Sequence, residues 1–494
     1  MDRIFVDGKR FVDEHGRERI FHGVNYGAKN YLITDRVNKK DPIRSINDEL
    51  SQIHCLGMNV VRYFVNWSLL EPKPGKYSKR AFAEMQTVLD TCYEKGMYVY
   101  IDMHQDLYSD FGEKKPGDGA PQWACLSDGK RFRQPLLIWA EGYFFSAAVH
   151  NSYDNFWNNT PVEGRGLQDR FCDLWGLIAK KFGSHPAVIG FDLLNEPFPG
   201  SDGKKVFFKI AKSALKTAAS DKRISKKTLL KSVFKKAPIK EILDQFGGEI
   251  LADITAPANE IIERFDREKY TPFINKAASA IRRECADKII LTENSYYSNL
   301  GIPFSGGPVS VNGSVDENQA FAPHAYDFMV DSPIYKYANN SRVKMIFDRR
   351  KYEQDSRLQM PVIVGEWGGG DKNGEWLHHA EFLLDLFDEY KWSNIYWAFS
   401  KDRFADGVND TLCRPYPVAV CGNINKIHYD KNAEVFELDF SQDSEYDVPT
   451  EIFCHRKPKN IVCGGEYELS KRYYYTYILK VKTVQGENKI RIEF

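Results

Sequence analysis

Short apolar runs recur along most of the chain, separated by longer stretches whose apolar side chains recur at three- and four-residue spacing. The short runs have the length and β-branched content of buried strands, and the longer stretches have the periodicity of amphipathic helices. The clearest predicted helices are residues 43–56, 80–95 and 167–182. The predicted strands are residues 20–25, 59–65, 97–104, 188–191, 288–293, 320–326, 361–367 and 393–399.

This alternation predicts an α/β fold, a (β/α)8 TIM barrel with insertions. A doubly wound open sheet is the alternative, but no Gly-rich nucleotide loop follows any of the runs. From about residue 424 the apolar residues alternate with period two between glycine turns, which predicts a C-terminal antiparallel β-sandwich. We expect the barrel over residues 1–422, with a basic helical insertion at about 198–287, and the sandwich over residues 423–494.

The insertion has an unusual charge distribution. Residues 204–240 contain thirteen Lys and Arg but one acid, Asp221, with apolar residues interleaved at roughly helical spacing. One interpretation is a pair of basic amphipathic helices that makes transient contact with an anionic membrane surface. The other is a solvated lid whose apolar face packs on the barrel. The sequence leaves both open.

The overall composition excludes several classes of function. The 68 basic and 68 acidic residues balance, so nothing global indicates a nucleic-acid partner. No run of eighteen apolar residues predicts a transmembrane helix. The nine scattered cysteines fit free thiols, and residues 1–9 lack the apolar core of a signal peptide. We therefore expect a cytoplasmic protein. No metal or organic cofactor is expected, because the histidines lack ligand spacing such as His-Glu-x-x-His.

Two glutamates stand where predicted strands end. The run 188–191 leads to Asn195, Glu196 and Pro197, and the run 361–367 closes on Glu366. Barrel enzymes keep their chemistry at the carboxyl ends of the strands. Cleavage of a glycosidic bond needs one acid to protonate the leaving oxygen and one carboxylate to attack or to activate water. The sequence therefore predicts that Glu196 and Glu366 face each other across a sugar.

Other polar side chains end neighbouring strands and could support this pair. Asn195 can bind a sugar 2-hydroxyl, and Arg62 can hold Glu366 ionised. Tyr326 can donate its phenol to the same carboxylate. His104 and His324 can each orient a carboxylate or bind a hydroxyl. Trp397 offers a flat face to a pyranose ring. Taken singly, each is more often a packing residue, but we expect all six at one end of the barrel.

These motifs together resemble family 5 glycoside hydrolases, and within that family endoglycoceramidases and related glycosylceramidases. Asn-Glu-Pro at the fourth strand indicates only the wider clan. His324-Ala325-Tyr326 and Gly365-Glu366-Trp367 indicate family 5. The motifs of the closer likeness are Gly23-Val24-Asn25 with Lys29, Asp102-Met103-His104-Gln105-Asp106, Asp118-Gly119-Ala120-Pro121-Gln122-Trp123 and Arg414-Pro415-Tyr416-Pro417. The resemblance extends over nearly the whole chain. A departure is Gln105, which stands where many members have glutamate.

The resemblance implies a retaining mechanism with Glu196 as acid/base and Glu366 as nucleophile. It implies a sugar site lined by Lys29, His104, Asp106, Asn195, Tyr326 and Trp397. It further implies a glycolipid substrate, cut between its reducing-end glucose or galactose and a lipid such as ceramide. Retention requires carboxyl groups about 5 Å apart, whereas inversion needs roughly 6.5–9.5 Å. A raised pKa is expected for Glu196, which must stay protonated beside a charged Glu366.

Other functions remain open from the sequence. A cellulase-like endo-β-glycanase would have a long open groove lined with tryptophans, whereas a glycolipid enzyme would have a sugar pocket beside an apolar slot. A steryl-β-glucosidase differs only in the lipid. A catalytically inactive carbohydrate- or membrane-binding barrel is the non-enzyme alternative. Neither the size of the glycan nor the oligomeric state follows from these patterns.

Overall fold

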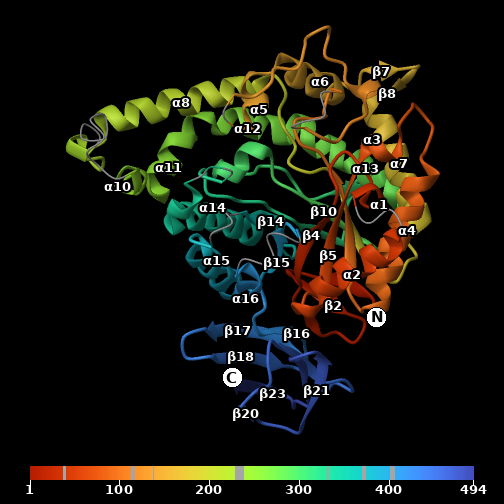
Figure 1. Cartoon of the computed structure of the whole chain (residues 1–494), viewed down its shortest axis with the longest axis vertical. Helices are drawn as coiled ribbons and strands as arrows, with labels where there is room; N and C mark the ends of the chain where they lie inside the picture. Colours follow the sequence, from red (N-terminus) through yellow and green to blue (C-terminus); the bar gives the residue numbers. More distant parts are fainter. Residues whose placement is uncertain are drawn as a thin grey trace.

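A computed structural model gives the arrangement of the chain (Figure 1). The structure describes residues 1–36, 41–112, 117–136, 138–228, 239–330, 332, 334–369, 374–400 and 407–494. Within these residues a barrel forms the larger part of the molecule, and antiparallel sheets lie below it in the view of Figure 1. The predicted fold class, a TIM barrel followed by antiparallel β-structure, is confirmed.

Eight parallel strands form the barrel in the order β13-β10-β9-β6-β5-β4-β15-β14. The ends of this order meet through bridges that pair Phe321 with Val362 and His324 with Glu366, which closes the barrel. The strands are β4 (His22–Gly27), β5 (Val60–Asn66), β6 (Tyr98–His104), β9 (Val188–Asp192), β10 (Ile289–Thr292), β13 (Gln319–Phe321), β14 (Ile363–Gly368) and β15 (Ser393–Trp397). The sixth strand is shorter than predicted, because Pro323 has no N–H to continue the ladder.

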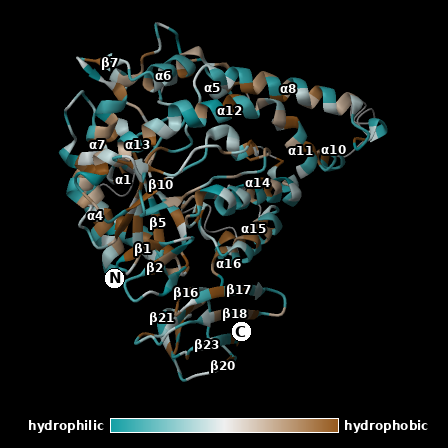
Figure 2. Cartoon of the chain, turned by 180° about the vertical axis from the view of Figure 1, so that it is seen from behind, coloured by the Kyte–Doolittle hydropathy of each residue, from teal (hydrophilic) through white to brown (hydrophobic). Residues whose placement is uncertain are grey.

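Helices cover the outside of the barrel. The predicted helix at 167–182 has the predicted bounds, and those at 43–56 and 80–95 each begin and end one residue earlier. The longer barrel helices are α2 (Pro42–Cys55), α4 (Lys79–Glu94), α7 (Leu167–Phe182), α13 (Thr271–Arg282), α14 (Asn340–Glu353) and α15 (Leu377–Tyr390). Shorter elements are α1 (Ile33–Arg36), α3 (Trp67–Leu70), α5 (Glu141–Phe145), α6 (Ala147–Trp157), α16 (Val408–Leu412), β7 (Pro161–Val162), β8 (Arg165–Gly166), β11 (Ser310–Val311) and β12 (Ser314–Val315). Apolar residues gather on the strands and on the inner helix faces (Figure 2).

The amino-terminal hairpin closes the lower end of the barrel. Its apolar side chains, Ile4 and Phe11, belong to the same buried cluster as Phe21, Tyr98 and the inward-facing residues of the barrel strands. The ring centroids of Phe11 and Phe21 lie 5.5 Å apart, and those of Phe21 and Tyr98 lie 5.6 Å apart. A packed lower end leaves the opposite end, where the strands finish, as the place for a site.

The C-terminal region contains two antiparallel sheets around a shared core. One has the order β1-β2-β3-β16-β19-β22-β21, and the other has the order β17-β18-β23-β20. The strands are β1 (Ile4–Asp7), β2 (Arg10–Asp13), β3 (Glu18–Arg19), β16 (Tyr416–Val420), β17 (Asn423–Asp430), β18 (Val435–Gln442), β19 (Thr450–Cys454), β20 (Asn460–Cys463), β21 (Tyr467–Tyr473), β22 (Thr476–Val481) and β23 (Gly486–Glu493). The sheets therefore do not follow the linear division at 422/423, because β1–β3 and β16 belong to the C-terminal part.

The segment after Glu196 forms an arm of helices beside the upper end of the barrel (Figure 1). It comprises α8 (Asp202–Ser220), α10 (Ile239–Leu243), α11 (Gly248–Thr255) and α12 (Asn259–Phe265). One long helix, α8, is described where one of the two interpretations placed a pair of basic helices, and residues 229–238 of this region lie outside the described residues. Among the described helices, none is both long and apolar enough to cross a membrane.

Candidate active site

Glu196 and Glu366 meet at the carboxyl ends of the barrel strands. Glu366 lies within β14, and Glu196 follows β9 by four residues with its backbone in the left-handed region, at φ 42°. A carboxylate oxygen of each residue and a ring nitrogen of His324 lie within 4.8 Å of one another. Carboxylate oxygens this close fit the short spacing of retaining enzymes, about 5–5.5 Å between carboxyl groups, better than the roughly 6.5–9.5 Å of inverting ones.

Glu196 is held from three directions. Its Oε1 atom accepts a 2.6 Å hydrogen bond from Asn299 Nδ2 and lies 3.1 Å from Nδ1 of His324. Its backbone N–H donates to Oε2 of Glu293 at 2.7 Å. Burial, followed by the negative charges of Glu366 and Asp106, raises the pKa of Glu196 well above its usual range. Such a carboxyl group holds its proton at neutral pH, as a general acid must.

Glu366 has stronger support for its ionised form. Arg62 Nη1 donates to its Oε1 atom at 2.7 Å, and the Tyr326 hydroxyl donates to its Oε2 atom at 2.9 Å. Burial raises the pKa of Glu366, and the charges of Arg62 and His104 together with the Tyr326 hydrogen bond oppose this rise. The two glutamates therefore differ in the sense that acid and nucleophile require.

Arg62 is the centre of a buried ionic network. Its guanidinium is fully buried and pairs with the carboxylates of Asp102, Asp192, Glu293 and Glu366 at 2.7–3.0 Å. It also donates to the Asn25 and Asn195 side-chain oxygens, at 2.9 and 3.0 Å. Five of these six contacts are hydrogen bonds, to Asp192, Asn25, Glu366, Asn195 and Glu293, which matches the five N–H donors of a planar guanidinium.

A second polar cluster surrounds His104. Its Nδ1 atom lies 2.8 Å from Asp102 Oδ2, and its ring stacks on Trp397 with centroids 5.1 Å apart. Burial lowers the pKa of His104, but Asp102 and Asp106 outweigh it and raise the pKa to about 10. Lys29 pairs with Asp106 and lies 5.1 Å from the centroid of the Trp397 ring. Several oriented donors and acceptors thus lie beside one aromatic ring.

The two glutamates lie in a cavity of about 780 Å³. Eight of the ten predicted site residues line it, namely Lys29, His104, Asp106, Asn195, Glu196, Tyr326, Glu366 and Trp397. A further part of its wall is apolar and consists of Ile138, Trp139, Phe144, Leu300, Phe328 and Val330. The cavity therefore combines a polar site with room for an apolar group.

Arg62 and His324, the other two predicted residues, do not line the cavity. Both are fully buried behind the glutamates that they contact. Their groups act on Glu366 and Glu196 rather than on a ligand. Burial, together with the positive charges of Arg62 and His104, lowers the pKa of His324 well below its usual value, so the ring is neutral.

Two residues of the site were not predicted. Glu293 directly follows β10 and contacts the backbone of Glu196, and Asn299 lies in the 3₁₀ turn Tyr296–Leu300. The position of Glu293 at a strand end is the signal that pointed to Glu196 and Glu366. Nothing in the local sequence distinguishes Asn299.

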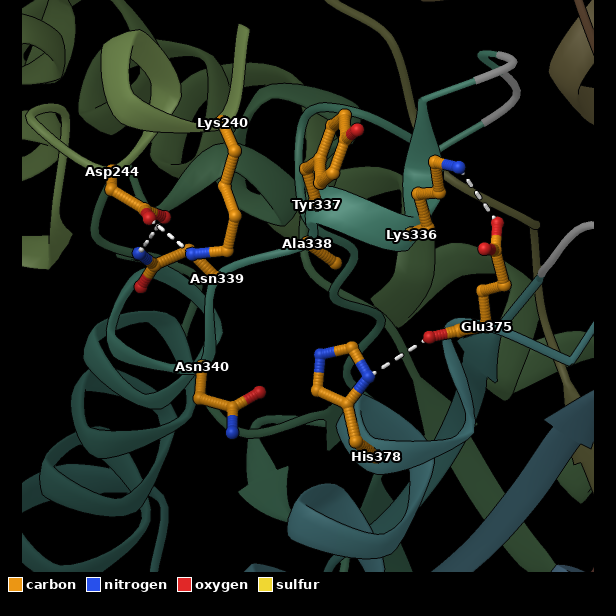
Figure 3. A pocket seen from close by; sticks show the side chains of 9 residues that line it. All are labelled: Lys240, Asp244, Lys336, Tyr337, Ala338, Asn339, Asn340, Glu375 and His378. Atoms are coloured by element: carbon orange, nitrogen blue, oxygen red, sulfur yellow. Dashed lines mark hydrogen bonds and ion pairs between the residues drawn. The ribbon is translucent and has the colours of Figure 1, made fainter. Parts of the chain in front are cut away.

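A second hollow, of about 610 Å³, lies between α10, the start of α14 and the segment before α15 (Figure 3). Its charged groups are largely paired with one another. Lys336 binds Glu375 at 2.8 Å, and Asn339 donates to Asp244 at 3.2 Å. None of the predicted site residues lines it. The cavity at the barrel mouth is therefore the candidate active site.

Residues 27–403 match the cellulase family, glycosyl hydrolase family 5, and residues 414–492 match the family 5 C-terminal domain. The chain belongs to glycoside hydrolase family 5. The first match begins at the last residue of β4 and covers the other seven barrel strands and both glutamates. The second covers most of the C-terminal sheets and does not include their three amino-terminal strands.

Relatives of this family 5 chain include endoglycoceramidase I of Rhodococcus hoagii, which is 30% identical over 91% of this chain and 79% of that protein. An endoglycoceramidase of Hydra vulgaris is 28% identical over 38% of this chain, and the match spans 39% of the relative's length. The solved structure of endo-glycoceramidase II from Rhodococcus sp. aligns with a TM-score of 0.72 at 21% identity, covering 99% of each chain. Further structures of that protein are a ganglioside GM3 complex and a lactosyl-enzyme intermediate.

Proposed function

We propose that this protein is a retaining β-glycosidase that cleaves glycolipids between the reducing-end sugar and the lipid. One observation carries the proposal: two buried carboxyl groups approach within 4.8 Å in a cavity whose wall is polar in one part and apolar in another. A sugar matches the polar groups and a lipid chain matches the apolar ones. The relatives named endoglycoceramidase support this choice of substrate.

In the proposed first step, the Glu366 carboxylate attacks the anomeric carbon while Glu196 protonates the glycosidic oxygen. The lipid alcohol leaves, and the sugar remains as an ester of Glu366. In the second step, Glu196, now ionised, removes a proton from a water molecule that displaces the sugar from Glu366. Arg62 and Tyr326 each bind one oxygen of Glu366, so they keep the attacking carboxylate oriented.

The remaining predicted residues have roles in binding under this proposal. Asn195 is suited to the sugar 2-hydroxyl, and Lys29 with Asp106 to other hydroxyls. Trp397 would contact a face of the ring. His324 would orient Glu196 through Nδ1. The apolar wall, which includes Trp139, Phe144 and Leu300, would receive the lipid.

Product analysis tests the proposal. Purified protein is incubated with glucosylceramide, galactosylceramide, a ganglioside and a steryl glucoside, and the products are separated by thin-layer chromatography. We expect release of the intact lipid from at least one glycosylceramide. Reaction with the steryl glucoside alone would favour a steryl-β-glucosidase. Cleavage of β-glucan chains but of no glycolipid would favour an endoglycanase. Among the described residues, two tryptophans, Trp139 and Trp397, line the cavity.

We further propose two features of the setting. Transient contact between the basic region 204–240 and a membrane surface would bring the enzyme to a lipid-borne substrate. A cytoplasmic location is supported by the nine cysteines, all of them free and five of them buried. Fractionation of cells that express the protein would test both.

A further inference from the structure

The outer face of α8 is both basic and apolar. Its five lysines, Lys204, Lys205, Lys209, Lys212 and Lys216, are all exposed. Two large apolar side chains lie among them and are also exposed, Phe208 by 53% and Leu215 by 74%. Residues seven apart lie on the same face of a helix, so these two form one apolar line with lysines beside it. The only acid in α8 is Asp202, in its first turn.

The inner face of the same helix is packed. Val206 is fully buried, and α8 contacts α11, α12 and α5. The ring of Phe207 stacks on that of Phe144 with centroids 4.7 Å apart, and Phe144 lines the active-site cavity. Phe144 therefore contacts α8 and also forms part of the apolar wall of the cavity. The arm and the C-terminal sheets lie at opposite ends of the molecule (Figure 1).

The loop before α5, a helix that packs on α8, also carries exposed apolar side chains. Leu136 is 79% exposed, and Ile138 is 41% exposed and also lines the cavity. Phe328, on another part of the cavity wall, is 39% exposed. Exposed apolar side chains therefore lie on α8, on the loop that leads into the neighbouring helix α5, and on the cavity wall.

We propose that the outer face of α8, with Leu136 and Ile138, docks on an anionic lipid bilayer. Phe208 and Leu215 enter the boundary between headgroups and acyl chains, and the lysine ammonium groups remain with the lipid phosphates and carboxylates. Each lysine near such a surface adds to the attraction. This docking brings the cavity mouth to the bilayer and lets the lipid of a substrate pass along the apolar wall; that step rests on the proposed function.

Co-sedimentation with vesicles tests the docking. The full-length protein is mixed with phosphatidylcholine vesicles or with vesicles that also contain phosphatidylserine, at low and at high salt. We expect binding to the anionic vesicles that weakens with salt. Both Lys212→Glu/Lys216→Glu and Phe208→Ser/Leu215→Ser should bind at least tenfold more weakly. A matched control, Lys457→Glu/Lys471→Glu, makes the same charge change on exposed lysines of the C-terminal region and should bind like the wild type.

An activity measurement separates the two proposals. All three variants are assayed on a soluble aryl β-glucoside and on glucosylceramide in anionic vesicles. Docking through α8 is supported if both α8 variants lose activity on glucosylceramide in vesicles, keep it on the soluble aryl β-glucoside, and differ in this from the control variant. Equal binding by wild type and both α8 variants, or equal binding to neutral and anionic vesicles, overturns it. A wild-type protein that cleaves neither substrate would contradict the proposed function, while the sedimentation result would still decide the docking.

Discussion

The Glu293 side chain accepts the backbone N–H of Glu196 through Oε2, at 2.7 Å. Its other oxygen, Oε1, contacts Arg62 at 2.7 Å and lies 3.4 Å from Nε2 of His324. Glu293 thus contacts three groups of the site. These are the backbone of Glu196, the His324 ring beside it, and Arg62, which binds Glu366. Glu293 lies behind Glu196 and does not line the cavity, so any effect on the reaction passes through other residues.

We expect Glu293→Gln to lower kcat by about tenfold to a hundredfold with a smaller change in KM. The amide keeps one acceptor for Glu196, but its NH2 group must face donors of Arg62. The pH dependence of kcat should also change, because a group beside Glu196 that can ionise is replaced by one that cannot. Glu317→Gln, on an exposed residue, is the control. A variant with wild-type kcat and an unchanged pH profile would show that Glu293 has only a structural role.

The two glutamates should respond differently to substitution. Glu366→Gln should lose several orders of magnitude in activity on all substrates, because no glycosyl ester can form. Glu196→Gln should lose about 10²- to 10⁴-fold on glycolipids, and less in the first step on aryl glycosides, whose leaving groups need little protonation. Added azide should restore turnover of an aryl glycoside by Glu196→Gln and yield a β-glycosyl azide. An α-glycosyl azide would instead show that Glu196 is the nucleophile and Glu366 the acid/base.

Glu196 should destabilise the fold as the pH rises. Its pKa is raised in the folded state, so its contribution to stability is present below its unfolded pKa and is lost as the pH rises through the folded one. Glu196→Gln cannot ionise, so its free energy of unfolding does not fall for this reason as the pH rises. We therefore expect the variant to have a higher Tm than the wild type, by on the order of a few degrees at neutral pH, with little difference near pH 4. Scanning calorimetry across this range provides the measurement, and a wild type of equal Tm at every pH would contradict it.

Arg62→Met should have the opposite effect on stability. The substitution leaves four buried carboxylates without their common cation, which is expected to cost about 3–5 kcal/mol. Protonation relieves part of this cost, so the loss should grow as the pH rises. Burial and the charge of Asp102 raise the pKa of Asp192 to about 7 even though Arg62 lowers it. Denaturant unfolding at two pH values would measure the difference, and a pH-independent loss would contradict this account.

The apolar wall should distinguish lipid substrates from soluble ones. Leu300→Ser removes apolar surface from the cavity wall. Burial of such a side chain is worth about 1.5–3 kcal/mol, so kcat/KM for glucosylceramide should fall roughly tenfold to a hundredfold. Activity on an aryl β-glucoside should change little. Val315→Ser, on an exposed valine away from the cavity, is the matched control. Equal losses on both substrates would show that the wall does not receive the lipid.

Much of the fold was predictable because each barrel strand is a compact local signal. The run 188–191 and the helix 167–182 carry their pattern within a few turns of chain, and the structure places them as predicted. Candidate residues at strand ends could be named for the same reason, since all parallel strands of a barrel finish at one end. Eight of the ten now line a single cavity.

The features that were missed depend on contacts between distant parts of the chain. Asn299 matters only because its turn brings it within 2.6 Å of Glu196, more than a hundred residues away. The pairing of β3 with β16 joins Arg19 to Ala419, and no local pattern reports a partner at that separation. The end of the sixth strand differed because Pro323 interrupts an otherwise apolar run.

Because β3 pairs with β16, the amino-terminal and carboxyl-terminal parts of the polypeptide share one sheet. A fragment that begins at β4 would leave one edge of β16 without its partner strand. It would also lack Ile4 and Phe11, which pack against the lower end of the barrel. Neither portion is thus a free-standing module for transplanting. Trimming some twenty residues from the front should make the recombinant product insoluble, although those residues lie at the far end from the catalytic pair.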